Sequence, residues 1–281
     1  MAQEFWNIPK GLITVFYGLA GVTIIIFVIG VWDKTRIWSR GQDVDQELKG
    51  KGFMGLIWLS ITTFFSPDCL LAQRVFPRSI LRGLMLMGII WGFTALFAGT
   101  IGRTINYWVF PFLEGGVWLS FSLVLDIAGA SVLIGTGFAL YRRYTNKPER
   151  MVKSTLDGML LFLLFFVIFT GFCVEGIRII VLKPPSADWS PVGYAFGGAI
   201  KVLVGENALG ALHQGAWVIH VLLAFLFIVY IPFSKYKHIF ASQITTYLSK
   251  NKWKDKEIPR DWVFGEEIER RKKERLSQLS K

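Results

Sequence analysis

Cysteine and histidine are scarce in this chain, and their scarcity excludes several kinds of cofactor site. The 281 residues include only two cysteines and three histidines. Cys69 and Cys173 lie far apart and no CxxC pair exists, so we do not expect this chain alone to build a zinc or iron–sulfur site. The chain also has no CxxCH motif, which excludes covalently attached c-type haem.

Apolar residues, in contrast, are abundant and gather in long runs. Hydrophobic residues make up 53% of the chain and aromatic residues 15%, which is typical of a protein that crosses a membrane several times. A transmembrane helix needs about 20 apolar residues. Five runs are long enough, namely 11–32, 83–102, 117–140, 156–182 and 215–233. The sequence therefore predicts an all-α integral membrane protein with a bundle of five transmembrane helices.

A sixth apolar stretch, GFMGLIWLSITTFF, extends from Gly52 to Phe65 and is too short to span a bilayer. We expect it to form an interfacial or re-entrant helix near residues 53–65.

The basic residues predict the orientation of the spans. The formal net charge is +11, and lysine and arginine cluster in residues 33–82, in residues 141–155 and after residue 234. The loops 103–116 and 183–214 carry almost none. Because cytoplasmic loops are enriched in lysine and arginine, we expect the N-terminus outside and the C-terminus in the cytoplasm. The basic charge is thereby explained by topology, and nucleic acid is not an expected partner.

The sequence predicts two parts, a membrane domain over residues 1–245 and a charged cytoplasmic tail over residues 246–281. The tail is mixed in charge, so it is either solvated, bound to lipid headgroups, or a docking arm for a cytoplasmic partner.

The last apolar run, GAWVIHVLLAFLFIVYIPFSKYKHIF, carries His220 and His238. Eighteen residues make five turns of a helix and about 27 Å, so both imidazoles are expected on one face near opposite membrane surfaces, with a bend at Pro232. Two imidazoles so placed suit two haems that carry electrons across the membrane. The alternative is that each histidine hydrogen-bonds a neighbouring helix.

Three segments carry a family resemblance. They are HVLLAFLFIVYIPFSKYKHI, RVFPRSILRGLMLMGIIWGFTALFAGT and TGFCVEGIRI. They resemble membrane cytochrome b subunits related to the gamma subunit of respiratory nitrate reductase, above all the branch of the membrane-bound heterodisulfide reductases and related complexes of sulfate reducers. The resemblance covers about residues 10–245. It implies b-type haem, a membrane quinone or similar carrier as substrate, and a cytoplasmic iron–sulfur subunit as partner.

The haem ligands of that family are incomplete in this sequence. Leu86 and Leu96 stand where the resemblance places histidines, and no histidine precedes His213. Three options follow: a haem held by one histidine, a methionine as sixth ligand, with Met85 and Met87 as candidates, or the loss of one or both haems. Methionine is a plausible axial ligand, although in an apolar helix it more often fills the core.

Glu175 and Arg178, three residues apart on the fourth run, can share a helix face. They either form a stabilising ion pair or, with His213, line a quinol site at the outer leaflet, where Glu175 takes a proton. Asp126, inside the third run, is expected to carry protons or to hydrogen-bond a haem propionate or another helix.

These observations predict a membrane anchor and quinone-reactive electron-transfer subunit in the cytoplasmic membrane. The residues assigned to it are Glu175, Arg178 and His213 for catalysis and His220 and His238, with Met85 and Met87, for haem. The loop 66–82 and the tail are expected to bind the iron–sulfur partner. The alternative is a haem-free anchor that only tethers that partner, and a transporter is disfavoured because no internal repeat is visible.

Overall fold

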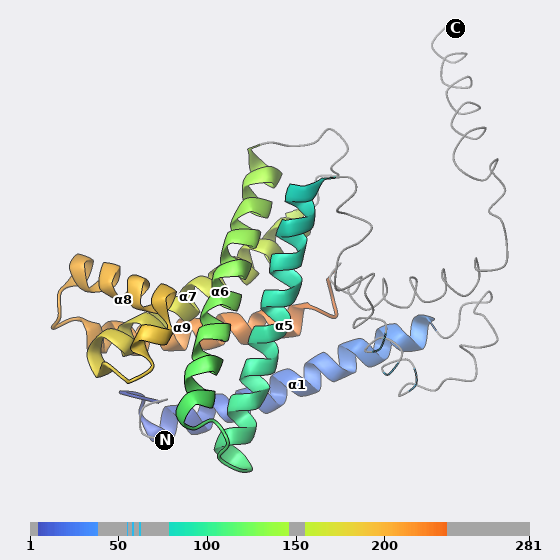
Figure 1. The fold of residues 1–281 in the computed structure, drawn as a ribbon. Coiled ribbons are helices and arrows are strands. Elements are labelled where there is room, and N and C mark those ends of the chain that lie inside the picture. Colours follow the sequence, from blue (N-terminus) through green and yellow to red (C-terminus); the bar gives the residue numbers. More distant parts are fainter. Residues whose placement is uncertain are drawn as a thin grey trace, which may run out of the picture.

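The computed structural model describes residues 5–38, 79–145 and 155–234, together with Gly55, Trp58 and Thr62. Within these residues every regular element is helical (Figure 1). The long helices are α1 (Lys10–Trp38), α5 (Ile80–Trp108), α6 (Gly115–Tyr144), α7 (Thr155–Leu182) and α9 (Leu209–Tyr230). Between the last two lie a 3₁₀ turn, η2 (Ala187–Trp189), and a short helix, α8 (Pro191–Val204).

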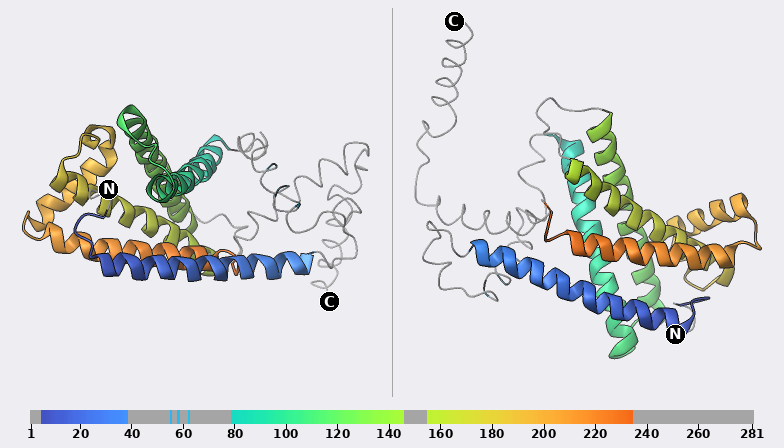
Figure 2. Two further views of the ribbon diagram at one scale, coloured as in Figure 1. Left: turned by 90° about the horizontal axis from the view of Figure 1, so that it is seen from below. Right: turned by 180° about the vertical axis from the view of Figure 1, so that it is seen from behind.

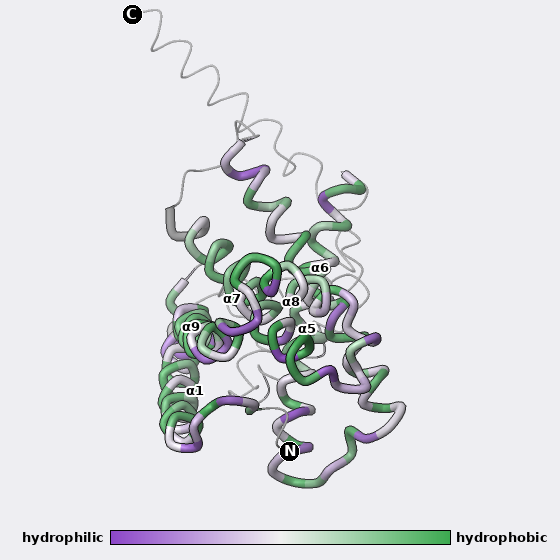
Figure 3. The backbone as a smooth tube through the Cα atoms, turned by 90° about the vertical axis from the view of Figure 1, so that its left-hand side faces the viewer, coloured by the Kyte–Doolittle hydropathy of each residue, from purple (hydrophilic) through white to green (hydrophobic). Residues whose placement is uncertain are grey.

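All five long helices are apolar and long enough to cross a membrane, as the sequence predicted. Large apolar side chains are exposed along them, for example Ile24, Ile25 and Ile29 of α1. Apolar residues also dominate the long helices in Figure 3. In a bilayer such faces meet lipid, so the interior of the bundle has to be recognised by its polar residues and close helix contacts.

Glycines set the closest helix contacts. A side chain on Gly92 of α5 would collide with the carbonyl oxygen of Ala128, 2.5 Å away on α6, so these two helices lie side by side (Figure 1). Gly176 of α7 and Gly197 of α8 face each other so closely that neither could carry a Cβ atom. The short α8 is therefore packed closely against α7.

An apolar core joins four of the long helices. Val132 of α6, Leu160 and Leu164 of α7 and Phe227 of α9 are buried together. Phe93 of α5 packs edge-on against Phe227, with ring centroids 5.9 Å apart. On the outside of this core α1 lies along α9, as both views of Figure 2 show.

The start of α1, the end of α5 and the start of α9 meet at one end of the protein. Asn7 donates a hydrogen bond to the carbonyl of Gly210 at 2.8 Å. The ring of Phe5 packs against Tyr107, 5.9 Å away near the end of α5. This arrangement brings the N-terminal segment and the ends of the two loops predicted to lie outside to the same end of the protein. The orientation in a membrane stays a prediction.

The last helix differs from its prediction at both ends. It begins at Leu209 rather than near residue 215, and it ends at Tyr230, before Pro232. Ile231 still has helical backbone angles, but Pro232 has no N–H to continue the hydrogen bonds of the helix, and the regular helix stops before it. His220 therefore lies near the middle of α9 and not near its outer end. The premise that one continuous helix carries His220 and His238 is wrong, and His238 lies outside the described residues.

The sixth apolar stretch is described at Gly55, Trp58 and Thr62 only, and all three are helical. The Thr62 hydroxyl donates to the carbonyl of Trp58 at 3.1 Å, one helical turn back. The remainder of residues 53–65 and the tail 246–281 lie outside the described residues.

Candidate quinone-reactive site

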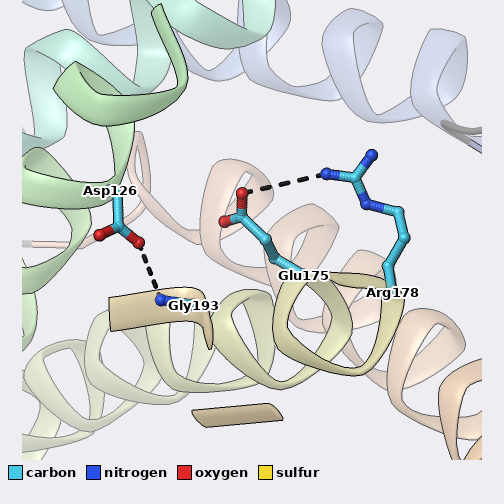
Figure 4. A network of polar contacts seen from close by, with 4 residues as sticks. All are labelled: Asp126, Glu175, Arg178 and Gly193. Carbon is cyan, nitrogen blue, oxygen red and sulfur yellow. Dashed lines mark hydrogen bonds and ion pairs between the residues drawn. The ribbon is translucent and has the colours of Figure 1, made fainter. Parts of the chain in front are cut away.

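A buried carboxylate attaches α8 to the bundle. Asp126 of α6 is only 1% exposed and accepts hydrogen bonds from the backbone N–H groups of Val192 and Gly193, both at 2.9 Å. These N–H groups belong to the first turn of α8, where amides have no partner within the helix and the helix dipole favours a negative charge. Of the roles predicted for Asp126, the structure shows the hydrogen bond to another helix (Figure 4).

Glu175 and Arg178 of α7 lie beside this attachment. Their side chains point toward each other, and Arg178 Nη2 is 4.0 Å from Glu175 Oε1, an ion pair at the limit of direct contact (Figure 4). Arg178 is 8% exposed. A Cβ atom on Gly193 would lie 3.4 Å from Glu175 Cγ, so the start of α8 forms one wall around the carboxylate. The shared helix face predicted from the three-residue spacing is confirmed.

Arg103 of α5 brings a second cation to Glu175, although it lies in a part of the sequence, 103–116, that was expected to be a loop. Its charge and those of Arg178 and Asp126 act on the Glu175 carboxylate. The guanidinium carbon lies 5.2 Å above the ring of Trp118 on α6. The one signal for it in the sequence was its position, directly after the uncharged apolar run 83–102.

His213 lies on α9, in its second turn, and is 1% exposed. Neither of its ring nitrogens has a hydrogen-bond partner among the described residues. The indole of Trp6 covers it, with ring centroids 4.9 Å apart, and the charge of Arg178 acts on it. An imidazole normally fills at least one hydrogen bond when buried, so this side chain is available for a ligand.

The segment that carries Trp6 is fastened to α9 on both sides of His213. Asn7 has a left-handed φ of 62°, donates from Nδ2 to Gly210, and accepts at its own carbonyl a 2.6 Å bond from Gln214 Nε2. Residues before the first span thus form the outer cover of His213, which no sequence pattern predicted.

An ion pair joins Glu175 to Arg178, and electrostatic interactions link Arg103 to Glu175 and Arg178 to His213. The four residues thus form one polar cluster at the end of the bundle where α1 begins. The three residues predicted as catalytic are neighbours in it, although their roles stay predictions. The cluster holds two guanidinium groups, a carboxylate and an unpaired imidazole, with Asp126 fixing its wall. Such a set can bind a neutral ring that bears oxygens and can take a proton from it.

His220 lies deeper in the bundle, against α7. Its Nδ1 is 3.0 Å from the carbonyl oxygen of Val167 and 3.2 Å from the hydroxyl oxygen of Thr170. Because a carbonyl oxygen only accepts, this bond places the proton on Nδ1. Nε2 then has a free lone pair and no hydrogen-bond partner among the described residues. This is the tautomer and the second hydrogen bond that metal-bound histidines usually have, so His220 fits an axial haem ligand.

Met85 and Met87 lie near the start of α5, and both are half-buried. Their role as a sixth haem ligand stays a prediction. Within the described ranges no group of three or more histidine, cysteine, aspartate or glutamate residues could hold a metal ion.

Five apolar spanning helices around a buried polar cluster define a multi-pass integral membrane protein. The sequence profile of the family described as nitrate reductase gamma subunit matches residues 108–254, more than half of the chain. The chain belongs to this family, which confirms the resemblance seen in its sequence.

The chain is similar to two longer proteins and to several proteins of about its own length. The EtfAB:quinone oxidoreductase of Syntrophomonas wolfei is 31% identical over 249 residues, which cover 85% of this chain and 33% of that protein. The probable iron–sulfur-binding oxidoreductase FadF of Bacillus subtilis is 22% identical over 84% of this chain and 32% of its own length. This chain therefore spans about a third of the length of these two relatives.

A third relative matches over nearly its whole length. It is one of the subunits of the dihydromethanophenazine:CoB–CoM heterodisulfide reductase of Methanosarcina thermophila, and it is 26% identical over 83% of this chain and 90% of its own length. No solved structure matches the chain significantly.

Proposed function

We propose that this chain is the membrane subunit of a quinone-linked oxidoreductase complex in the cytoplasmic membrane. In this role it passes electrons between a membrane quinone or similar carrier and a cytoplasmic iron–sulfur partner. The proposal is supported by the family, whose relatives are named for quinone, for dihydromethanophenazine and for iron–sulfur binding. The observation that carries it is the buried cluster of Glu175, Arg178 and His213, a polar site at the end of the bundle where α1 begins.

The cluster suits the oxidation of a quinol. One hydroxyl of the quinol donates its proton to the Glu175 carboxylate, and the oxygen of the other is held by the unpaired imidazole of His213. Arg178 stabilises the charged carboxylate before the transfer. The quinol loses two protons and two electrons, and the electrons reduce two oxidised iron–sulfur centres of the partner by one electron each. The second proton leaves on the outer side.

The proposal includes b-type haem, with His220 and His238 as its candidate ligands. His238 lies outside the described residues. A b-type haem, when bound, supplies a one-electron carrier within the membrane. His220 would hold it through Nε2, while Val167 fixes the imidazole through Nδ1. A reduced-minus-oxidised absorption spectrum of the purified complex tests this point, and we expect a b-type signal.

A haem-free anchor that only tethers the iron–sulfur partner is the second candidate. It is favoured by Leu86 and Leu96, which have no ligating atom. A purified complex without a Soret band and without a pyridine haemochrome would support it. The predicted binding surfaces for the partner, residues 66–82 and the tail, are untested because they lie almost wholly outside the described residues.

The experiment that tests the quinol site is Glu175→Gln. The amide keeps the size of the side chain but cannot take a proton, so we expect quinol oxidation to slow about a hundredfold, within the usual range for a lost general base. Assembly and the absorption spectrum should stay unchanged. Glu206→Gln is the matched control, since this carboxylate is exposed and pairs with Lys201 at 2.9 Å. Lower yield with normal turnover per assembled complex would assign Glu175 to a structural ion pair.

A further inference from the structure

Arg103 is the one cation of the cluster that neither the sequence nor the comparisons assign. It lies in α5, five residues before the end of that helix. Its guanidinium carbon is 5.2 Å from the ring centroid of Trp118 and 5.9 Å from that of Phe121, so both rings of α6 support it. Cation–π contacts of this kind hold a guanidinium in place without using its N–H groups.

The Nε–H group of Arg103 is thereby left for another partner. Its Nε is buried and has no hydrogen-bond partner among the described residues. A buried N–H without an acceptor carries a desolvation penalty that a bound oxygen atom would remove. The same is true of the ring nitrogens of His213.

Arg103 lies on the side of α6 whose later part holds the wall beside Glu175. The rings that support it, Trp118 and Phe121, belong to the helix whose Asp126 fixes the start of α8 next to the Glu175 side chain. The positive charge of Arg103 also acts on the Glu175 carboxylate, which is 4.0 Å from Arg178. A carrier bound at Glu175 can therefore present an oxygen to the unpaired Nε–H of Arg103.

Resting on the proposed function, we propose that Arg103 binds one oxygen of the quinone-type carrier through its Nε–H, beside the Glu175 carboxylate that takes the proton. Arg103 is a substrate-binding residue in this arrangement, and Trp118 positions it.

The test compares Arg103→Gln and Arg103→Lys in the assembled complex, with menadiol as the reduced probe and menadione as the oxidised one. Lysine keeps the charge that acts on Glu175 but has no N–H at the Nε position. We therefore expect both variants to raise the KM for menadiol, and the Kd for menadione, about tenfold, the usual effect of losing a charge-assisted hydrogen bond. The kcat at saturating menadiol should change little. Lys183→Gln removes an exposed cation at the same end of the protein and should leave all three constants unchanged.

The outcomes separate this inference from the proposed function. If Arg103→Lys binds menadione as the wild type does, Arg103 acts only through its charge and the inference is wrong. It is also wrong if Arg103→Gln is unaffected while Glu175→Gln is slow, and in that case the proposed function stands. If Glu175→Gln and a His213 variant also oxidise menadiol normally, the proposed function itself fails. Should Arg103→Gln not assemble, Trp118→Leu removes the supporting ring, and it must raise the KM for menadiol as well.

Discussion

At the scale of the residue, the His213 side chain should lower the stability of the protein, because it is buried and has no hydrogen-bond partner among the described residues. An unpaired buried polar group costs about 1–3 kcal/mol. We therefore predict that His213→Phe raises the thermal unfolding midpoint of the complex and at the same time slows menadiol oxidation. The phenyl ring can still pack against Trp6, 4.9 Å away in the native protein.

Differential scanning calorimetry and turnover on the same preparation check this prediction. A midpoint that falls would mean that the imidazole has a stabilising partner in the native complex. A raised midpoint with full turnover would remove His213 from the site.

Gly171 provides the space in which the His220 imidazole lies. A Cβ atom at this position would be 3.2 Å from His220 Cε1, closer than nearly all real contacts of this kind. Gly171→Ala should therefore push the ring away from Val167 and disturb its Nδ1 hydrogen bond. If His220 is an axial ligand, the Soret band of the complex should shift or weaken.

Gly137→Ala serves as the control for this change, because its added Cβ atom would meet Phe165 at an ordinary 3.7 Å. An unchanged spectrum in a haem-containing Gly171→Ala complex would show that His220 holds no haem.

At the scale of the element, the packing of α8 on α7 is the feature most open to test. Gly197 and Gly198 are neighbours on α8, but an added Cβ atom would collide with the Gly176 carbonyl at the first position and would meet nothing within 4 Å at the second. We predict that Gly197→Ala separates the two helices, lowers the yield of assembled complex and slows menadiol oxidation, because α8 forms a wall beside Glu175.

Gly198→Ala should instead be neutral or stabilising by up to about 1 kcal/mol, since alanine favours the helix over glycine. Yield, thermal midpoint and turnover of the two variants give the comparison. Equal behaviour of the pair would contradict the close α7–α8 contact.

At the scale of the whole molecule, the prediction concerns orientation. In a variant with Cys69 and Cys173 replaced by serine, Asn207→Cys lies in the connection between α8 and α9 and Thr145→Cys at the end of α6, and both positions are exposed. A membrane-impermeant maleimide added to intact cells should label Asn207→Cys, whereas Thr145→Cys should react only after permeabilisation. The reverse pattern would invert the topology and place the Glu175 cluster on the cytoplasmic side.

The sequence alone determined the class of protein and the number of its spans. Apolar runs of about 20 residues require helices in a bilayer, because no water there can satisfy the backbone, and this rule is local. It predicted the five spans, with α9 displaced at both ends. The same local rules predicted the shared face of Glu175 and Arg178, and the motifs predicted the family.

Only the tertiary structure decided which polar groups meet. The partner of a buried charge depends on which helices pack together, and here glycine contacts such as Gly92 with Ala128 and Gly176 with Gly197 set that packing. Arg103 and Glu175 are 72 residues apart, and no periodicity relates them. The sequence left several roles open for Asp126, and the structure shows one of them, the hydrogen bonds to the start of α8. Hydropathy is a property of each segment, whereas a site is a property of the contacts between segments.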